Sequence, residues 1–167
     1  MTTFDVRRLR LRAGDQIRER VEIDLESLQL AGQEYDPSPN PVAADLLVTR
    51  ASSGTVLELA FDATLSGPCF RCLADAELVL SLRLREYSAT KPESEEDSTE
   101  YLVDDQLDLS GWARDAIVLA LPEQILHDPD CAGLCPVCGK DLNVEPHEHV
   151  EETVDPRWEA LSRLREE

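Results

Sequence analysis

Cysteine and histidine side chains are the residues of this sequence best suited to do chemistry, because both are common metal ligands. The chain holds five cysteines and three histidines: Cys69, Cys72, His127, Cys131, Cys135, Cys138, His147 and His149. A C-x-x-C pair brings two sulfurs to one side of a tight turn, and such pairs begin at Cys69 and at Cys135. Because four ligands complete a tetrahedral zinc site, these residues are enough for two zinc ions.

The spacing favours two structural zinc sites. The four ligands nearest the C-terminus, from Cys135 to His149, would form a local site. The other four would form a second site that ties the Cys69-Phe-Arg-Cys72 turn to the segment around Cys131. One alternative is a single zinc in a ribbon-like site, held by Cys69, Cys72, Cys135 and Cys138, and another is that the chain binds no metal. In either case four protein ligands leave no position for water, so the metal is expected to stabilise a small lobe and not to catalyse.

Two enzyme classes that use C-x-x-C pairs are disfavoured by the order and context of the motifs. A zinc deaminase needs H-x-E before P-C-x-x-C, whereas His149-Val-Glu151 follows Pro68-Cys69 here. A dithiol oxidoreductase carries its C-x-x-C at a helix N-terminus, but this pair lies between two alternating segments. The sequence contains no P-loop or dinucleotide fingerprint. We therefore expect a protein that is not an enzyme and has no small-molecule substrate.

Composition predicts a globular, cytoplasmic protein. The sequence has 167 residues, of which 42% are hydrophobic. It contains neither a secretory signal nor an apolar run of about eighteen residues, so no contact with a membrane is expected. Thiols stay reduced in the cytoplasm, and the odd number of cysteines argues against a complete set of disulfides.

The net charge of −19 disfavours a protein that coats nucleic acid, because such proteins usually carry the opposite balance. The acidic surface suits a basic protein partner better. The N-terminus differs, since residues 1–21 hold six arginines against three acids. Four of them, Arg7, Arg8, Arg10 and Arg12, either contact ribosomal RNA or an acidic partner, or simply line the solvated edge of a sheet.

Alternation of apolar and polar residues predicts an antiparallel sheet with one face in solvent. The strongest alternation lies near residues 21–25, 42–48, 57–65 and 76–84. Leu9 and Leu11 are expected to add a short strand, and three prolines predict a loop over residues 33–41. The first C-x-x-C pair is placed at the tip of the hairpin that joins the last two strands. The strongly acidic residues 86–108 predict a surface loop.

Two helices are predicted. Asp108 caps a helix that ends before Pro122 and covers the apolar face of the sheet. Asp155-Pro156 starts a short amphipathic helix, which docks either on its own domain or on a partner. The predicted fold class is therefore α+β, with an antiparallel sheet and a covering helix. The predicted units are a sheet-and-helix domain over residues 1–126, a zinc-knuckle lobe over 127–150 and a C-terminal helix over 151–167.

These motifs, in this order, resemble the YceD-like family, which is tied to accumulation of large-subunit (23S) ribosomal RNA. The resemblance covers roughly residues 55–165 and is strongest in two segments, Cys69-Phe-Arg-Cys-Leu73 and Cys131-Ala-Gly-Leu-Cys-Pro-Val-Cys-Gly-Lys-Asp-Leu-Asn143. Family members commonly carry cysteine where this chain has His127, His147 and His149, which implies that all three are ligands. Other members lack most of the cysteines, so the resemblance implies that the metal is a scaffold.

The resemblance implies a ribosome-biogenesis factor that supports production or stability of the large ribosomal subunit. Together with the acidic charge, it leads to the hypothesis that the chain holds a basic ribosomal protein or a large-subunit precursor particle. One alternative is direct RNA binding through the arginine-rich N-terminus and the zinc lobe. Another is a zinc-knuckle adaptor between proteins that has no connection with ribosomes.

Overall fold

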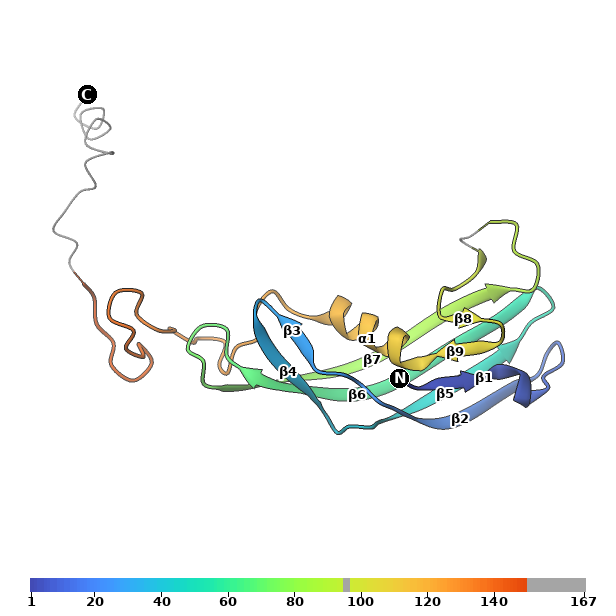
Figure 1. Ribbon diagram of the computed structural model, residues 1–167, viewed down its shortest axis with the longest axis horizontal. Coiled ribbons are helices and arrows are strands. Elements are labelled where there is room, and N and C mark those ends of the chain that lie inside the picture. Colours follow the sequence, from blue (N-terminus) through green and yellow to red (C-terminus); the bar gives the residue numbers. More distant parts are fainter. Residues whose placement is uncertain (95–96, 150–167) are drawn as a thin grey trace, which may run out of the picture.

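The computed structural model describes residues 1–94 and 97–149, which form mostly antiparallel β-sheet with one α-helix. The molecule is elongated, with the Cys- and His-rich segment at one end and the N-terminal loops at the other (Figure 1). The strands are β1 (Thr3–Asp5), β2 (Gln16–Ile23), β3 (Leu28–Leu30), β4 (Gln33–Ser38), β5 (Val42–Arg50), β6 (Gly54–Pro68), β7 (Asp75–Ala89), β8 (Leu102–Val103) and β9 (Gln106–Asp108). The helix predicted over residues 151–167 lies outside the described residues.

The main sheet has six strands in the order β2-β5-β6-β4-β3, and β7 pairs with the other edge of β6. The β6–β7 hairpin is its longest part, with an antiparallel register from Gly54 opposite Ala89 to Pro68 opposite Asp75. Buried residues alternate with partly or fully exposed ones along most of β5 and β6, as the sequence predicts for a sheet with one wet face. This hairpin positions the first C-x-x-C pair, because the strands lead directly into it.

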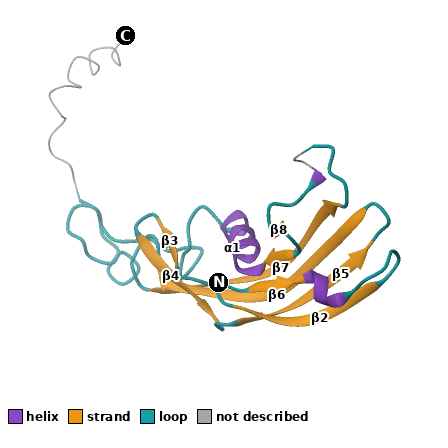
Figure 2. Cartoon of the chain, turned by 45° about the vertical axis from the view of Figure 1, so that its right-hand side comes forward, coloured by secondary structure: helices purple, strands orange, loops and turns teal. Residues whose placement is uncertain are grey.

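The apolar face of the sheet is covered by the helix α1 (Leu109–Ala120) and by a small sheet of order β1-β9-β8 (Figure 2). The Asp108 carboxylate caps α1 by accepting a hydrogen bond from the Gly111 N–H at 3.0 Å, which confirms the predicted cap. Trp112, Ala113 and Ile117 of α1 are buried in the core. None of the helices in the described part of the chain has the length and apolar character needed to cross a membrane.

Three details of the predicted secondary structure are wrong. Val6–Leu9 forms the 3-10 helix η1 where a strand is expected from Leu9 and Leu11. The segment expected as a loop over residues 33–41 contains β4, because Tyr35 and Pro37 alternate with exposed residues and are buried against β6. The acidic segment 86–108 is a loop only in part, since β7 continues to Ala89 and the short strands β8 and β9 form before α1.

Candidate metal centres

The tip of the β6–β7 hairpin presents Cys69 and Cys72 on one tight turn. The Cys69 N–H donates to the Ala74 carbonyl at 2.7 Å, and the Leu73 N–H donates to the Cys69 carbonyl at 3.0 Å. Tyr35 of β4 anchors the start of the turn, because its hydroxyl donates to the Pro68 carbonyl at 2.8 Å. Both cysteines are buried. The sheet and the turn therefore place the two cysteine side chains together at the tip of the hairpin.

Arg71, between these cysteines, joins the hairpin tip to the segment that carries His127 and Cys131. Its guanidinium donates to the Gln124 side chain and to the Cys131 carbonyl, both at 3.0 Å. Its own carbonyl accepts from the Leu134 N–H at 3.1 Å. The segment after α1 is therefore held against the turn by hydrogen bonds that involve the backbone of both segments.

The first cluster consists of Cys69, Cys72, His127 and Cys131, whose ligand atoms all lie within 4.8 Å of one another. The Cys69 and Cys131 sulfurs are 3.8 Å apart, and the Cys72 sulfur is 3.3 Å from Nδ1 of His127. Two sulfurs bound tetrahedrally to one zinc, each at roughly 2.3 Å, would be about 3.8 Å apart. The donor set and its spacing thus fit a four-coordinate metal ion.

The second cluster consists of Cys135, Cys138, His147 and His149, again with ligand atoms within 4.8 Å of one another. The turn that holds its cysteines closes when the Gly139 N–H donates to the Cys135 carbonyl at 2.8 Å. Nε2 of His147 lies 3.1 Å from the Cys138 sulfur, while its Nδ1 lies 2.7 Å from the Glu145 carbonyl. The carbonyl fixes the tautomer of His147 and leaves Nε2 free for a metal. Cys138 and His149 are exposed, so this cluster is the more accessible of the two.

Asn143 supports the first cluster from outside, a role that the spacing of ligands does not reveal. Its side-chain N–H groups reach the Cys131 sulfur at 3.6 Å and the Asp141 carboxylate at 2.7 Å. Its side-chain oxygen accepts from the Ala132 N–H at 2.7 Å. Partners of this kind orient ligands and tune their basicity. The only signal for it in the sequence is the position of Asn143 at the end of the Cys-rich motif.

Hydrogen bonds lower the pKa of two of the cysteine thiols, which favours the thiolate form that binds metals. Burial acts to raise the pKa of Cys69, but hydrogen bonds from His127 and from backbone N–H groups outweigh it and lower this pKa to about 5. The backbone N–H of Cys138 is the main reason why the pKa of Cys135 falls to about 6. The Ala74 N–H acts to lower the pKa of Cys72, but burial and the neighbouring sulfurs raise it to about 11. A metal that binds Cys72 must therefore displace a proton.

The structure brings the eight predicted ligand residues together in the same two sets that the two-site hypothesis proposes. The set required by the single ribbon-like site, Cys69, Cys72, Cys135 and Cys138, is not among the clusters formed by residues 1–94 and 97–149. Both clusters are close enough to hold a metal ion. The second of the two sets is local in sequence, whereas the first depends on the fold.

Gly133 allows the lobe to approach Arg71, and its replacement by alanine is expected to weaken this junction. A Cβ at Gly133 would lie 3.2 Å from Cβ and 3.3 Å from the carbonyl oxygen of Arg71. Gly139→Ala is the matched control, because φ is +79° at Gly133 and +73° at Gly139, but a Cβ at Gly139 meets no atom within 4 Å. The free energy of unfolding should fall by about 1 kcal/mol in both variants, because alanine, unlike glycine, disfavours a left-handed backbone conformation. Urea unfolding should show a larger loss for Gly133→Ala, and equal losses would contradict the close approach.

Comparisons with known proteins find a matching family model and relatives in Mycobacterium and Bacillus species. The family model described as "Large ribosomal RNA subunit accumulation protein YceD" matches residues 57–165. The chain is 38% identical over 125 residues to the uncharacterized protein Rv2926c of Mycobacterium tuberculosis, covering 72% of this chain and 60% of the relative. It is 31% identical over 114 residues to the uncharacterized protein YlbN of Bacillus subtilis, covering 64% of this chain and 66% of the relative. The match thus spans about 60% of the length of the mycobacterial relative. No solved structure matches the chain.

Proposed function

The chain belongs to the YceD family of large ribosomal RNA subunit accumulation proteins, and on this basis we propose that it is a non-enzymatic ribosome-biogenesis factor. In this proposal it acts in the cytoplasm and supports the accumulation, processing or stability of large-subunit ribosomal RNA. The observation that carries the proposal is the family match over residues 57–165, which spans both Cys/His clusters.

Zinc is the metal in this proposal, and its role is structural. The first cluster offers three sulfurs and one nitrogen, and the second offers two of each. Such donor sets suit zinc, and four protein ligands close each site to water. The chain would use the first ion to fix the lobe on the hairpin tip and the second to fold the lobe itself. The lobe can then present a defined surface to a partner.

The distribution of charge supports a basic protein partner and suggests where it docks. On the solvent face of the sheet, opposite charges pair across strands, as with Arg85 and Glu58 at 3.7 Å. The acidic excess lies instead in residues 86–108, where nine acids face one lysine, and in residues 123–149, where six acids face one lysine. A lysine- and arginine-rich ribosomal protein, free or within a precursor particle, would be attracted to these two segments.

Charge-neutral variants test this mechanism. Glu93→Gln, Glu100→Gln and Asp104→Asn together should weaken binding to basic proteins extracted from large ribosomal subunits by about tenfold or more, with a smaller dependence on salt. The matched control carries the same three changes of charge in the main sheet: Glu22→Gln, Glu34→Gln and Asp45→Asn. Equal binding by both triple variants would exclude the acidic segment as the docking surface. Tight binding to deproteinised ribosomal RNA, with none to the basic proteins, would contradict a protein-mediated mechanism.

A further inference from the structure

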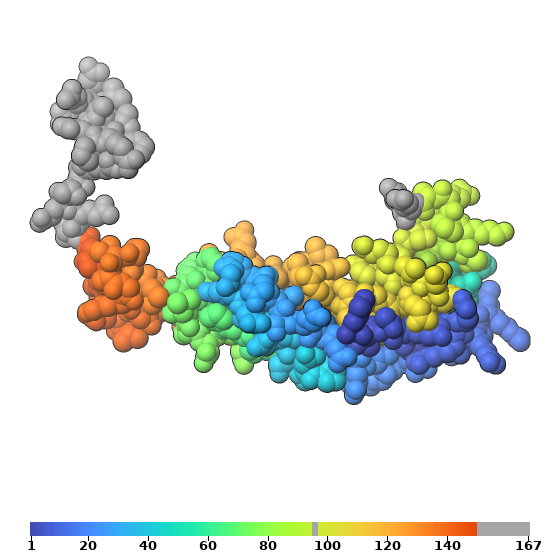
Figure 3. Space-filling model, in the orientation of Figure 1, coloured from blue at the N-terminus to red at the C-terminus, as the bar shows by residue number. Residues whose placement is uncertain are grey.

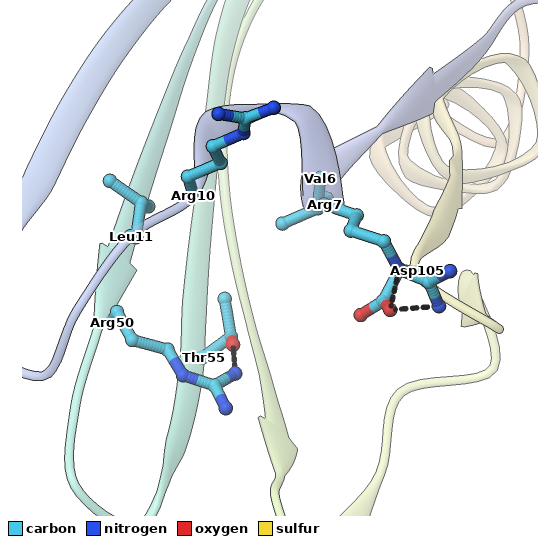
Figure 4. Close-up of a pocket in the computed structure, with 7 residues that line it drawn as sticks. All are labelled: Val6, Arg7, Arg10, Leu11, Arg50, Thr55 and Asp105. Atoms are coloured by element: carbon cyan, nitrogen blue, oxygen red, sulfur yellow. Dashed lines mark hydrogen bonds and ion pairs between the residues drawn. The ribbon is translucent and has the colours of Figure 1, made fainter.

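A small pocket opens at the end of the molecule opposite the metal centres. It has a volume of about 220 Å³ and is lined by Val6, Arg7, Arg10, Leu11, Arg50, Thr55 and Asp105. The lining side chains come from the N-terminal segment around η1, the adjoining ends of β5 and β6, and the turn between β8 and β9 (Figure 4). In the space-filling view the N-terminal segment and the Cys-rich lobe occupy opposite ends (Figure 3). The pocket thus belongs to a separate surface from the metal centres.

Arg50 is the central feature of this pocket. It is half-buried, and its guanidinium donates to two hydroxyl groups, those of Thr55 at 2.6 Å and Thr90 at 3.3 Å. A guanidinium has five N–H donors, and the bonds to the two hydroxyl groups use two of them. Among the ion pairs of the described residues none involves Arg50. Among the described residues, both hydrogen-bond partners of this half-buried guanidinium are hydroxyl groups, although the chain has more than twice as many acids as bases.

The neighbouring charges leave the pocket positive. Arg7 donates to the Asp105 carboxylate at 3.0 and 2.7 Å, which neutralises the one acid in the lining and joins η1 to the β8–β9 turn. Arg10 forms no ion pair in the described part of the chain. Its φ of +49° is left-handed, a conformation that costs an arginine roughly 1 kcal/mol more than a glycine. Within residues 1–94 and 97–149, Arg10 and Arg50 are therefore two cations without an acidic partner.

The geometry points to a binding site for one phosphate group of an RNA backbone, held by the Arg50 guanidinium beside the Thr55 and Thr90 hydroxyls. The Arg10 side chain is directed away from Arg50 and adds positive charge next to the pocket (Figure 4). Guanidinium groups match the oxygens of phosphate, and the pocket is smaller than those that bind drug-sized ligands, of about 300 Å³ and more. Arg8 and Arg12 are exposed on the same N-terminal segment and extend the positive surface along which a backbone would run. This inference rests on the proposed function, which brings the chain to ribosomal RNA or its precursor particles.

Fluorescence anisotropy with a single-stranded RNA of about twelve nucleotides tests the site in the full chain across a range of salt concentrations. The double variant Arg10→Gln/Arg50→Gln should bind at least about tenfold more weakly. The slope of log K against log salt should become shallower by about 0.7 for each phosphate that the variant no longer neutralises. The control is Arg83→Gln, an exposed arginine in the middle of β7, which should bind like the wild type. Arg50→Lys keeps the charge without the planar fork and should be intermediate.

The proposal is overturned if the double variant, shown by circular dichroism to be folded, binds RNA within twofold of the wild type, or if Arg83→Gln is equally impaired. Titration with inorganic phosphate, followed by ³¹P NMR, separates the two sources of phosphate. Loss of phosphate binding in the double variant with unchanged RNA binding would make the ligand a free phosphate and would also overturn the proposal. The proposed function is judged separately, by whether depletion of the whole protein lowers large-subunit ribosomal RNA.

Discussion

On the proposal that each cluster holds a zinc ion, replacing Cys131 by serine is expected to remove one of the two ions and to loosen the attachment of the lobe to the hairpin tip. The Cys131 sulfur lies 3.8 Å from the Cys69 sulfur, and the Cys131 carbonyl accepts a hydrogen bond from the Arg71 guanidinium. Loss of the ion therefore disconnects residues that only the fold brings together. Structural zinc contributes roughly 10–16 kcal/mol to the folding of small zinc peptides, so the lobe should lose several kcal/mol.

Cys138→Ser makes the same chemical change at the second cluster and serves as the control. Cys138 is exposed and its cluster is local in sequence, so this variant should also lose one zinc but leave the hairpin tip ordered. Native mass spectrometry gives the number of bound ions, and hydrogen exchange gives the protection of residues 69–74 and 131–149. Two zinc ions in Cys131→Ser, or equal loss of protection at the tip in both variants, would contradict the assignment of ligands.

Replacing Trp112 by alanine is expected to have the largest effect on the sheet-and-helix core. Trp112 is 3% exposed and stacks on Tyr101 with ring centroids 6.1 Å apart. Removal of a buried aromatic side chain costs about 3–5 kcal/mol, because the cavity that it leaves is only partly filled. Leu119→Ala, on the same helix but 88% exposed, should change stability by about 0.5 kcal/mol or less. Urea unfolding followed by circular dichroism measures both, and similar losses would mean that α1 is not anchored through Trp112.

Local patterns in the sequence predict the framework of the fold well. The alternation in residues 57–65 and 76–84 places the central hairpin, and Asp108 marks the start of α1, because strand faces and helix caps depend on near neighbours. The same patterns do not predict β4, because prolines near Pro37 are typical of loops. Proline is tolerated there because the pairing of β4 with β3 ends at Tyr35, so Pro37 lies where β4 pairs with β6 alone and has an edge that needs no ladder hydrogen bond.

The metal clusters and the arginine pocket differ in how far the sequence predicts them. The C-x-x-C turns are local, and the donor count leaves His127 and Cys131 to pair with the hairpin tip. The supporting contacts of Arg71 and Asn143 arise only when distant segments meet. Arg50 gives no signal at all, because its surroundings come from three separate parts of the chain. Contacts of this kind depend on tertiary structure, which spacing along the chain does not encode.

The measurement that tests the central claim most directly is the ratio of large- to small-subunit ribosomal RNA after depletion of this protein, with the ends of precursor RNA mapped. If the chain supports large-subunit ribosomal RNA, that species should fall selectively, with unprocessed ends accumulating, and expression of the wild-type chain should restore it. An unchanged ratio with normal precursor ends would contradict the proposed function, whatever the metal content of the two clusters proves to be.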